Sequence, residues 1–361
     1  ATDRWCSAEA TRVETRDHWG SKSADAAASC PDAETEEAVK IVAEIGAAHN
    51  GTLDRAIRTI QAAADVGADA IKLQTWTPDT MDCGGRIVDA GTWRGMALRD
   101  LYRKHTPWEW YPALITEATR LGLEWWSTPF DAQSVGFLEV LGCPRYKIAS
   151  FEIVDLALIR CASMTRKPLI ISTGMATVAE IDDAVYAADK SHVTLLKCVS
   201  SYPASPADYN LQTMRNMKAK FVCDIGLSDH TQDSTVAVAA AMLGATMIER
   251  HLTISRDDGL DDAFASTPDQ FKDMVRAVRT AQEALGTVSY GVMPSEEFQH
   301  ALRRSLWVWH DVKVGDTVTH ENVRSARPAD GLPPKQMPGI VGKKFTRDIP
   351  AGTPMSLDLC R

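Results

Sequence analysis

From residue 39 onward, short apolar runs alternate with stretches in which apolar residues recur at the period of an α-helix. The helical stretches, such as LDRAIRTIQAAADVGA at 53–68, often end at a glycine, which is a common signal for the end of a helix. The apolar runs are short and rich in β-branched residues, as expected of buried strands. They are KIVAEIG (40–46), AIKLQT (70–75), LEWWSTP (123–129), YKIAS (146–150), PLIIST (168–173), VTLLKC (193–198), FVCDIGLSD (221–229) and ATMIERHLT (245–253).

Eight such strands alternating with eight helices predict a (β/α)8 TIM barrel. An open, doubly wound sheet is the structural alternative. The interval between the second and third strands is longer than the others, so we expect it to hold one helix and an inserted excursion.

The two ends of the chain follow different patterns. Residues 1–38 have no sustained period and lack a basic segment followed by an apolar one, so they predict a poorly ordered extension and not a secretory signal. The barrel domain is predicted over 39–287, with a linker at 288–302. Residues 303–361 contain short β-like runs broken by Gly and Pro, which predict a small, mostly β domain.

Polar residues stand at the C-terminal end of every predicted barrel strand. Chemistry in a TIM barrel takes place at this rim, and helix capping alone does not need lysines, glutamates and histidines. The sequence therefore predicts one shared polar pocket. Its members are Glu44, Lys72, Gln74, Ser127, Thr128, Lys147, Ser150, Ser172, Ser200, Ser228, His230, Glu249 and His251.

Two histidines end consecutive strands. If His230 and His251 converge at the rim, they suit a catalytic divalent metal that keeps open positions for water or substrate. The alternative is that each imidazole only makes local hydrogen bonds. Glu249, on the same strand as His251, is expected to face a reacting proton or a ligand hydroxyl. Arg250 lies on the opposite face and is expected to pack against a helix or to pair outside the barrel.

Two lysines surrounded by hydroxyl groups suggest an anion site. Lys72 and Lys147 supply charge-assisted donors that fit a phosphate or a carboxylate. The alternative is that each lysine forms a structural ion pair. The hydroxyl groups come from Ser127, Thr128, Ser150, Ser172 and Ser228.

Composition narrows the class of protein. The chain has 361 residues, of which 45% are hydrophobic and 24% charged, which is typical of a globular enzyme. A net charge of −9 argues against nucleic acid or an anionic membrane as a partner. No apolar run reaches the roughly 20 residues that span a bilayer. The 8 cysteines form no CxxC pair, which favours reduced thiols and a cytoplasmic location.

The ordered motifs from about residue 40 to the C-terminus resemble the sialic acid synthase family. This family joins phosphoenolpyruvate to an amino sugar on a TIM barrel, and the tail is similar to its antifreeze-like (SAF) domain. The matching stretches are AEIGAAHNG, GADAIKLQT, STPFD, YKIASFEI, ISTGMAT, SSYPA, GLSDHT, GATMIERHLT, RSARPADGL and GKKFTRDIPAGTPM.

Within the family, the pseudaminic acid synthase branch is the most similar. TPDTM, LYRKHTPWEW and LLKCVSSYPA look like that branch, and Ser200 stands where sialic acid synthases carry Asn. The resemblance implies condensation of phosphoenolpyruvate with a 2,4-diacetamido-2,4,6-trideoxy-L-altrose, giving a nine-carbon acid and phosphate. N-acetylneuraminate or legionaminic acid synthesis is the nearest alternative.

The resemblance also implies roles for individual residues. His230 and His251 would hold Mn²⁺ or Mg²⁺. Glu44 and Glu249 would handle protons and orient hydroxyls, while Lys72 and Lys147 would stabilise developing charge. Phosphoenolpyruvate would be bound by Lys72, Thr128, Lys147, Ser150, Ser172, Ser200 and Ser228. The sugar would be bound by Gln74, Tyr202, Asp261 and, from the partner subunit of a domain-swapped homodimer, Arg327.

Two hypotheses from other classes stay open at this point. The tail is compatible with a sugar- or surface-binding protein whose barrel has lost activity, although that would predict missing lysine or metal positions. A metal-dependent aldolase or a seven-carbon sugar-acid synthase shares the barrel chemistry but does not explain the tail.

Overall fold

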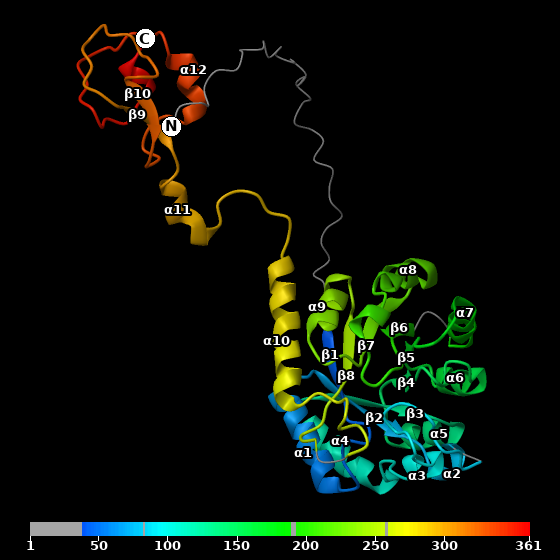
Figure 1. Cartoon of the computed structure of the whole chain (residues 1–361). Coiled ribbons are helices and arrows are strands. Elements are labelled where there is room, and N and C mark those ends of the chain that lie inside the picture. Colours follow the sequence, from blue (N-terminus) through cyan, green and yellow to red (C-terminus); the bar gives the residue numbers. More distant parts are fainter. Residues whose placement is uncertain (1–37, 82–83, 189–192, 257–258) are drawn as a thin grey trace, which may run out of the picture. The chain divides into compact units, whose positions relative to one another are not determined.

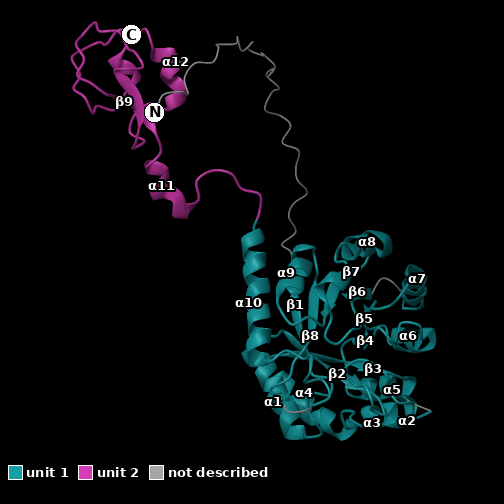
Figure 2. Ribbon diagram, viewed as in Figure 1, with its two compact units in different colours: residues 1–286 teal, residues 287–361 magenta. Residues whose placement is uncertain are grey.

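The computed structural model describes residues 38–361, apart from 82–83, 189–192 and 257–258. The chain divides into two compact units, residues 1–286 and 287–361 (Figure 2). The predicted N-terminal extension therefore lies outside the described residues, except for Ala38. The predicted limits of barrel, linker and SAF domain stay predictions.

The first unit is a closed barrel of eight parallel strands, which confirms the predicted fold and excludes the open sheet. Each strand pairs with the next one along the chain, and β8 pairs with β1 to close the barrel. The strands are β1 (Lys40–Glu44), β2 (Ala70–Thr75), β3 (Glu124–Pro129), β4 (Tyr146–Ile148), β5 (Leu169–Ser172), β6 (Val193–Cys198), β7 (Asp224–Asp229) and β8 (Met247–His251).

Helices follow the strands and cover the outside of the barrel (Figure 1). Their starts match signals in the sequence: the Thr52 side chain accepts a hydrogen bond from Arg55 N, and Thr177 and Thr267 form capping boxes. The helices are α1 (Leu53–Asp65), α4 (Tyr111–Arg120), α5 (Ala132–Val140), α6 (Leu156–Ser163), α7 (Val178–Ala187), α8 (Gln212–Phe221), α9 (Thr235–Met242) and α10 (Pro268–Leu285), with a 3-10 turn η3 (Pro206–Asp208) before α8.

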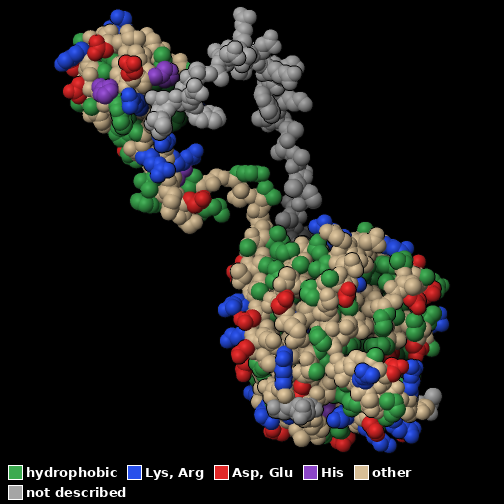
Figure 3. Space-filling model, in the orientation of Figure 1, with side chains coloured by type: hydrophobic (Ala, Val, Ile, Leu, Met, Phe, Trp, Pro, Cys, Tyr) green, Lys and Arg blue, Asp and Glu red, His purple; other side chains and the backbone are tan. Residues whose placement is uncertain are grey.

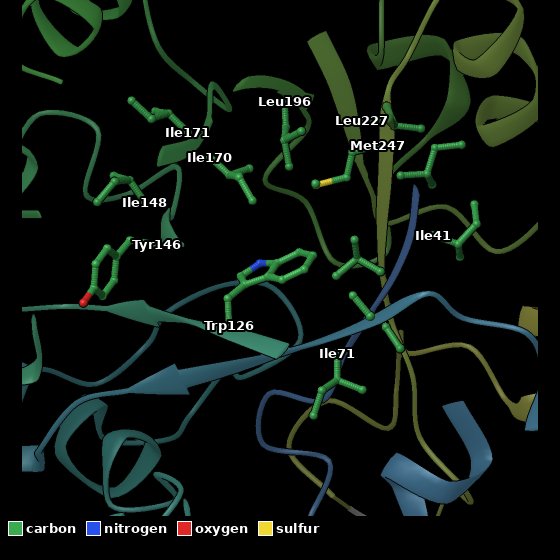
Figure 4. Close-up of a cluster of buried hydrophobic side chains, with 14 of the residues drawn as sticks. Ile41, Ile71, Trp126, Tyr146, Ile148, Ile170, Ile171, Leu196, Leu227 and Met247 are labelled. Carbon is green, nitrogen blue, oxygen red and sulfur yellow. The ribbon is translucent and has the colours of Figure 1, made fainter. Parts of the chain in front are cut away.

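Large apolar side chains fill the barrel below its polar rim. Trp126 is fully buried and projects from β3 into a cluster with Ile170, Leu196 and Met247 (Figure 4). Packing of this kind makes a TIM barrel a solid core and not a pore. It leaves the C-terminal strand ends as the place where polar groups gather.

The long β2–α4 connection contains α2 (Pro78–Met81), α3 (Leu98–Tyr102) and a 3-10 turn η1 (Trp108–Trp110). Between α2 and α3 the chain folds back on itself as a short hairpin. Val88 N donates to Met96 O at 2.9 Å, Gly95 N donates to Val88 O at 2.7 Å, and Ile87 pairs with Ala97. The sequence predicted an excursion here but not this hairpin.

The second unit has its own small core, which includes Leu306, Val308, Val323 and Phe345. β9 (Ser305–Val308) and β10 (Val323–Ala326) pair antiparallel, and isolated β-bridges connect much of the rest. The short helical segments are η4 (Pro294–Glu296), α11 (Glu297–Ala301), η5 (Pro334–Gln336), α12 (Met337–Ile340) and η6 (Leu357–Leu359). The prediction of a small, mostly β second domain is confirmed.

Acidic and basic side chains are mixed over the barrel face shown in Figure 3. Within the residues that the structure describes, no helix is both long and apolar enough to cross a membrane. The cysteines of the same part of the chain, Cys143, Cys161, Cys198, Cys223 and Cys360, are free thiols.

Candidate active site

The strand register brings the predicted rim residues of β1, β2 and β8 together. Glu44 lies opposite Lys72 on one side and opposite His251 on the other. Side chains alternate between the two faces of a strand, so Glu249, two residues before His251, points into the barrel as well. All four side chains are at least largely buried.

Glu249 is the centre of a buried charge network. Its Oε1 lies 2.8 Å from Lys72 Nζ and 3.7 Å from Lys147 Nζ, and Lys72 also lies 2.5 Å from Glu44 Oε2. Ser228 Oγ donates to the same Glu249 oxygen at 3.5 Å. The ion pair that the sequence left open as an alternative for each lysine is thus present for both.

The two lysines differ in their electrostatics. Burial disfavours the ammonium form of Lys72, but Glu249 and Glu44 hold its pKa above the ordinary value. Lys147 is dominated by burial, which lowers its pKa to about 8, with Glu249 opposing the shift and Lys72 adding to it. The pKa of Glu249 is low because Lys147 and Lys72 outweigh the effect of burial. Lys147 is therefore the lysine that lacks a full countercharge.

Some hydroxyl groups at the strand ends have no hydrogen-bond partner within the protein. Thr128 Oγ1 and Ser172 Oγ are buried without a hydrogen-bond partner. Ser150 and Ser200 meet at Gly174: an added Cβ on this glycine would lie 2.8 Å from Ser150 Oγ and 2.3 Å from Ser200 Oγ. Buried donors without partners are costly unless a ligand satisfies them, so Thr128 and Ser172 fit an anion site, with Ser150 and Ser200 close to each other at Gly174.

Ser127, which the sequence placed among the hydroxyl groups of the pocket, does not belong there. Its hydroxyl group hydrogen-bonds Thr75 Oγ1 at 2.6 Å, and Thr75 in turn contacts Tyr111 OH of α4. Ser127 and Thr128 are adjacent on β3, so they must point to opposite faces. Thr128 faces the interior and Ser127 faces the helices.

The two predicted metal ligands lie side by side. The ring centroids of His230 and His251 are 5.5 Å apart, and the Tyr202 ring lies 4.3 Å from that of His230. His230 Nδ1 is 2.7 Å from the Val199 carbonyl oxygen, so Nδ1 donates there and the Nε2 lone pair is left for another partner. His251 Nδ1 is buried without a hydrogen-bond partner, 3.5 Å from Asp261 Oδ2.

These donors fit an open divalent site. Two imidazoles with available nitrogen atoms would leave several coordination positions for water and substrate. No cluster of three or more His, Cys, Asp or Glu side chains suited to a metal occurs within the described ranges.

Asp261, Glu44 and Gln74 converge on the backbone of Gly46. An added Cβ on Gly46 would lie 2.4 Å from Asp261 Oδ2, 3.2 Å from Glu44 Oε1 and 3.5 Å from Gln74 Nε2. Gly46 N donates to Glu44 Oε1 at 2.5 Å, and Ala47 N donates to Asp261 Oδ2 at 3.0 Å. Since Asp261 also approaches His251, this group joins the predicted sugar residues to the histidine pair.

Sequence reasoning missed four residues near this rim. Glu152, beyond the end of β4, is partly buried with a buried Oε2 that has no hydrogen-bond partner, and burial raises its pKa to about 7. Phe264 and Trp93 pack against Tyr202 with centroids 4.9 Å and 5.5 Å away. Cys198 Sγ lies 4.0 Å from Ser200 Oγ. Only Glu152, in the motif YKIASFEI, carried a signal, because it lies in the loop a few residues after β4.

Arg250 pairs on the outer face of the barrel, as expected. It forms a buried ion pair with Asp229, and its guanidinium also donates to Thr231 Oγ1 at 3.2 Å and to Asp233 O at 2.6 Å. The three ionisable residues at the end of β8 therefore serve two faces. Glu249 and His251 face the pocket, and Arg250 locks β8 to β7.

Arg327 belongs to the second unit, where it is exposed directly after β10. The geometry of the barrel unit therefore neither includes it nor tests its predicted role.

The closed barrel carries a lysine pair, free hydroxyl groups and a histidine pair at its strand ends. Comparison with protein families shows to which class of protein this barrel belongs. The NeuB family model matches residues 59–290, and the SAF domain model matches residues 303–359. The chain belongs to the NeuB family.

Particular relatives narrow the position within the family. A pseudaminic acid synthase of Helicobacter pylori is 40% identical over 329 residues, covering 88% of this chain and 97% of the relative. An N,N'-diacetyllegionaminic acid synthase of Legionella pneumophila is 34% identical, covering 87% of this chain and 92% of the relative. The crystal structure of an N-acetylneuraminic acid synthetase of Leptospira borgpetersenii, in complex with citrate, matches with a TM-score of 0.64 and 29% identity. It covers 73% of this chain and 90% of that one.

Proposed function

We propose that this protein is a pseudaminic acid synthase. It condenses phosphoenolpyruvate with 2,4-diacetamido-2,4,6-trideoxy-L-altrose, giving pseudaminic acid and phosphate. The observation that carries the proposal is the lysine pair of Lys72 and Lys147 within one barrel mouth beside the pair of His230 and His251. Identity to relatives named as pseudaminic acid synthases supports the choice of sugar.

The anion half of the site receives phosphoenolpyruvate. Lys147, with its incomplete countercharge, and Lys72 pair with the phosphate and carboxylate groups of this substrate. The free hydroxyl groups of Thr128 and Ser172 donate to its oxygens. Ser150, Ser200 and Ser228 complete the set of donors.

The acceptor half receives the open-chain sugar at Gln74, Tyr202 and Asp261. His230 and His251 hold a divalent metal, Mn²⁺ or Mg²⁺, which when bound supplies Lewis-acid polarisation of the aldehyde oxygen. Since Asp261 lies close to both His251 and Gly46, it fixes the sugar relative to the metal ligands. Holding both substrates at one rim supplies the entropic part of the rate gain.

The reaction forms one carbon–carbon bond and replaces the C2–oxygen bond to phosphate with a C2–oxygen bond from water. C3 of phosphoenolpyruvate attacks the aldehyde carbon, whose oxygen takes up a proton. Water then adds at C2, and the tetrahedral intermediate releases phosphate. The lysines stabilise charge on the phosphate and carboxylate throughout. Glu44 and Glu249, buried next to the lysines, orient the water and carry protons.

Two further parts of the proposal concern the whole protein. We place it in the cytoplasm, where phosphoenolpyruvate is available. We also propose a domain-swapped homodimer in which Arg327 of the partner subunit binds an N-acyl group of the sugar. The exposed apolar rim residues Phe151, Val154, Met175 and Val178 would be covered by such an assembly.

The test is phosphate release by the purified full chain with Mn²⁺, phosphoenolpyruvate and a panel of acceptor sugars. We expect the L-altrose derivative to give the highest kcat/KM, with a nine-carbon acid in the product mixture by mass spectrometry. The diacetamido precursor of legionaminic acid is the second candidate, which the relatives at 34% and 31% identity favour. Higher kcat/KM with that sugar or with N-acetylmannosamine would reassign the acceptor. Binding of a sugar with no turnover under any metal would contradict the enzymatic proposal.

A further inference from the structure

The aromatic residue Trp93 is not used by the function proposed above, although it lies beside the predicted sugar site. It sits at the tip of the hairpin between α2 and α3. Its ring centroid is 5.5 Å from that of Tyr202 and 5.9 Å from that of Phe264. Tyr202 and Phe264 in turn contact His251, at 6.2 Å and 5.0 Å. Trp93 is thus two ring-to-ring steps from the proposed metal ligands.

The indole is held in place on two sides. Its Nε1 donates to Leu260 O at 3.1 Å, in the loop after β8. The neighbouring Thr92 hydroxyl group donates to Tyr202 O. The hairpin is therefore bound to both loops that carry predicted sugar residues. Trp93 is nevertheless only partly buried, and it lines a cavity.

A cavity of about 370 Å³ adjoins Trp93. Trp93, Met96, Leu260 and Ala263 give it an apolar part, and the rest of its lining comes from Thr92, Lys104, Arg256, Gly259 and Asp262. A cavity that combines apolar surface with a few polar groups suits a substituent that has both an apolar and a polar part. An acylamino group is such a substituent, whereas a hydroxyl group would leave the apolar part unfilled.

We propose that Trp93 is a specificity-determining residue, and that this cavity accepts the acyl substituent that the sugar carries at C4, remote from the aldehyde. The inference rests on the proposed function. An open-chain sugar with its aldehyde at the histidine pair extends along Tyr202 toward Trp93. The methyl end of the C4 acetamido group then packs on the indole face, where apolar contact favours it over a hydroxyl group.

The experiment compares two acceptors that differ only at C4: the 2,4-diacetamido-2,4,6-trideoxy sugar and the 2-acetamido-2,6-dideoxy sugar with a C4 hydroxyl group. Trp93→Ala should raise KM for the diacetamido sugar roughly tenfold, the scale of one apolar group in a pocket. The KM for phosphoenolpyruvate should not change. The preference of the enzyme for the diacetamido sugar should shrink by a similar factor, while Trp93→Phe keeps most of it.

The matched control is Tyr186→Ala, an exposed aromatic residue on α7 at 86% exposure, which should leave all constants unchanged. Equal loss with both acceptors would make Trp93 a structural support of the Tyr202 loop and overturn the inference, as would unchanged preference in Trp93→Ala. If the wild type turns over neither acceptor, the proposed function fails and this inference fails with it. If the wild type turns over the diacetamido sugar and the preference of Trp93→Ala is unchanged, only this inference fails and the proposed function stands.

Discussion

At the scale of single residues, Glu249 holds two buried lysines with one carboxylate. Each lysine has at most 5% of its side chain exposed. Buried charges are tolerated only when they are paired. The buried lysines therefore lower the stability of the barrel when no ligand is bound. A bound anion pairs with them and raises that stability, so substrate binding and the stability of the barrel are coupled.

Removing the carboxylate should expose this coupling. Glu249→Gln removes the carboxylate that pairs with both buried ammonium groups, and Lys72 keeps its ion pair with Glu44. We therefore expect the free energy of unfolding to fall by roughly 3–5 kcal/mol. Phosphoenolpyruvate should then raise the Tm more in this variant than in the wild type, as measured by thermal unfolding. Asp54→Asn, which breaks an exposed pair with Arg58, should change stability by less than about 1 kcal/mol. A loss in Glu249→Gln no larger than that would refute the coupling.

The pH dependence of substrate capture should follow Lys147. Its pKa of about 8 means that the free enzyme loses this positive charge as the pH rises through that value. The kcat/KM for phosphoenolpyruvate, which reports groups of the free enzyme, should fall on the alkaline side with an apparent pKa near 8.

Lys147→Arg provides the check, because a guanidinium group stays charged over this range. Its residual kcat/KM should lack the alkaline decline. If the decline survives in this variant, another group causes it.

The rim residues also show how much of the candidate site could be predicted from the sequence alone. Lysines, glutamates and histidines at strand ends were predictable, because few structural roles require them there. The prediction for Ser127 was wrong because a hydroxyl group is found on either face of a strand. Only the register of β3 decides which face the Ser127 side chain occupies. Trp93 and Phe264 gave no signal, since their contacts depend on how two long loops fold over the rim.

At the scale of elements, the alternation of β3 makes a direct prediction. Thr128→Val removes a free hydroxyl group from the pocket and should raise KM for phosphoenolpyruvate, by up to about tenfold for a lost hydrogen bond, with little change in stability. Ser127→Ala breaks the hydrogen bond to Thr75, which in turn contacts Tyr111, and it should cost about 1 kcal/mol of stability without changing that KM. Kinetics and denaturant unfolding of both variants test the assignment. The reverse pattern would mean that β3 has the other register.

At the scale of the whole molecule, each unit carries its own apolar core. A chain ending at Gly286 should therefore retain a cooperatively folded barrel that binds phosphoenolpyruvate, and circular dichroism and calorimetry would check this. Loss of folding in the shortened chain would show that the barrel needs the second unit for stability.

The role of Arg327 also belongs to this scale. Arg327→Ala should raise the KM of the sugar far more than that of phosphoenolpyruvate. Arg324→Ala, on β10 and packed over Trp309 at 5.3 Å, is the control and should change neither KM. Equal effects of Arg327→Ala on both substrates would contradict the proposal.

Mixing two impaired chains, assayed at a sugar concentration at which each alone has little activity, distinguishes the swapped arrangement from one within a single subunit. Arg327→Ala has an intact barrel, and Lys147→Met has an intact second unit. If Arg327 acts across subunits, dissociating and reassembling the two variants together should restore activity, up to about one competent site per mixed dimer. No recovery, with mixed dimers shown to form, would place Arg327 over its own barrel.

The polar rim is divided between two kinds of backbone. Groups assigned to phosphoenolpyruvate stand mostly on or just beyond strands that are hydrogen-bonded on both sides. The acceptor side is instead completed by the hairpin around Trp93 and the segment from Gly259 to Phe264. Insertions or substitutions in those two loops can alter which aldehyde is accepted while the barrel keeps its pairing. New acceptor preferences in this lineage therefore have a route that leaves the donor chemistry untouched, and libraries aimed at unnatural nonulosonic acids are best confined to those two loops.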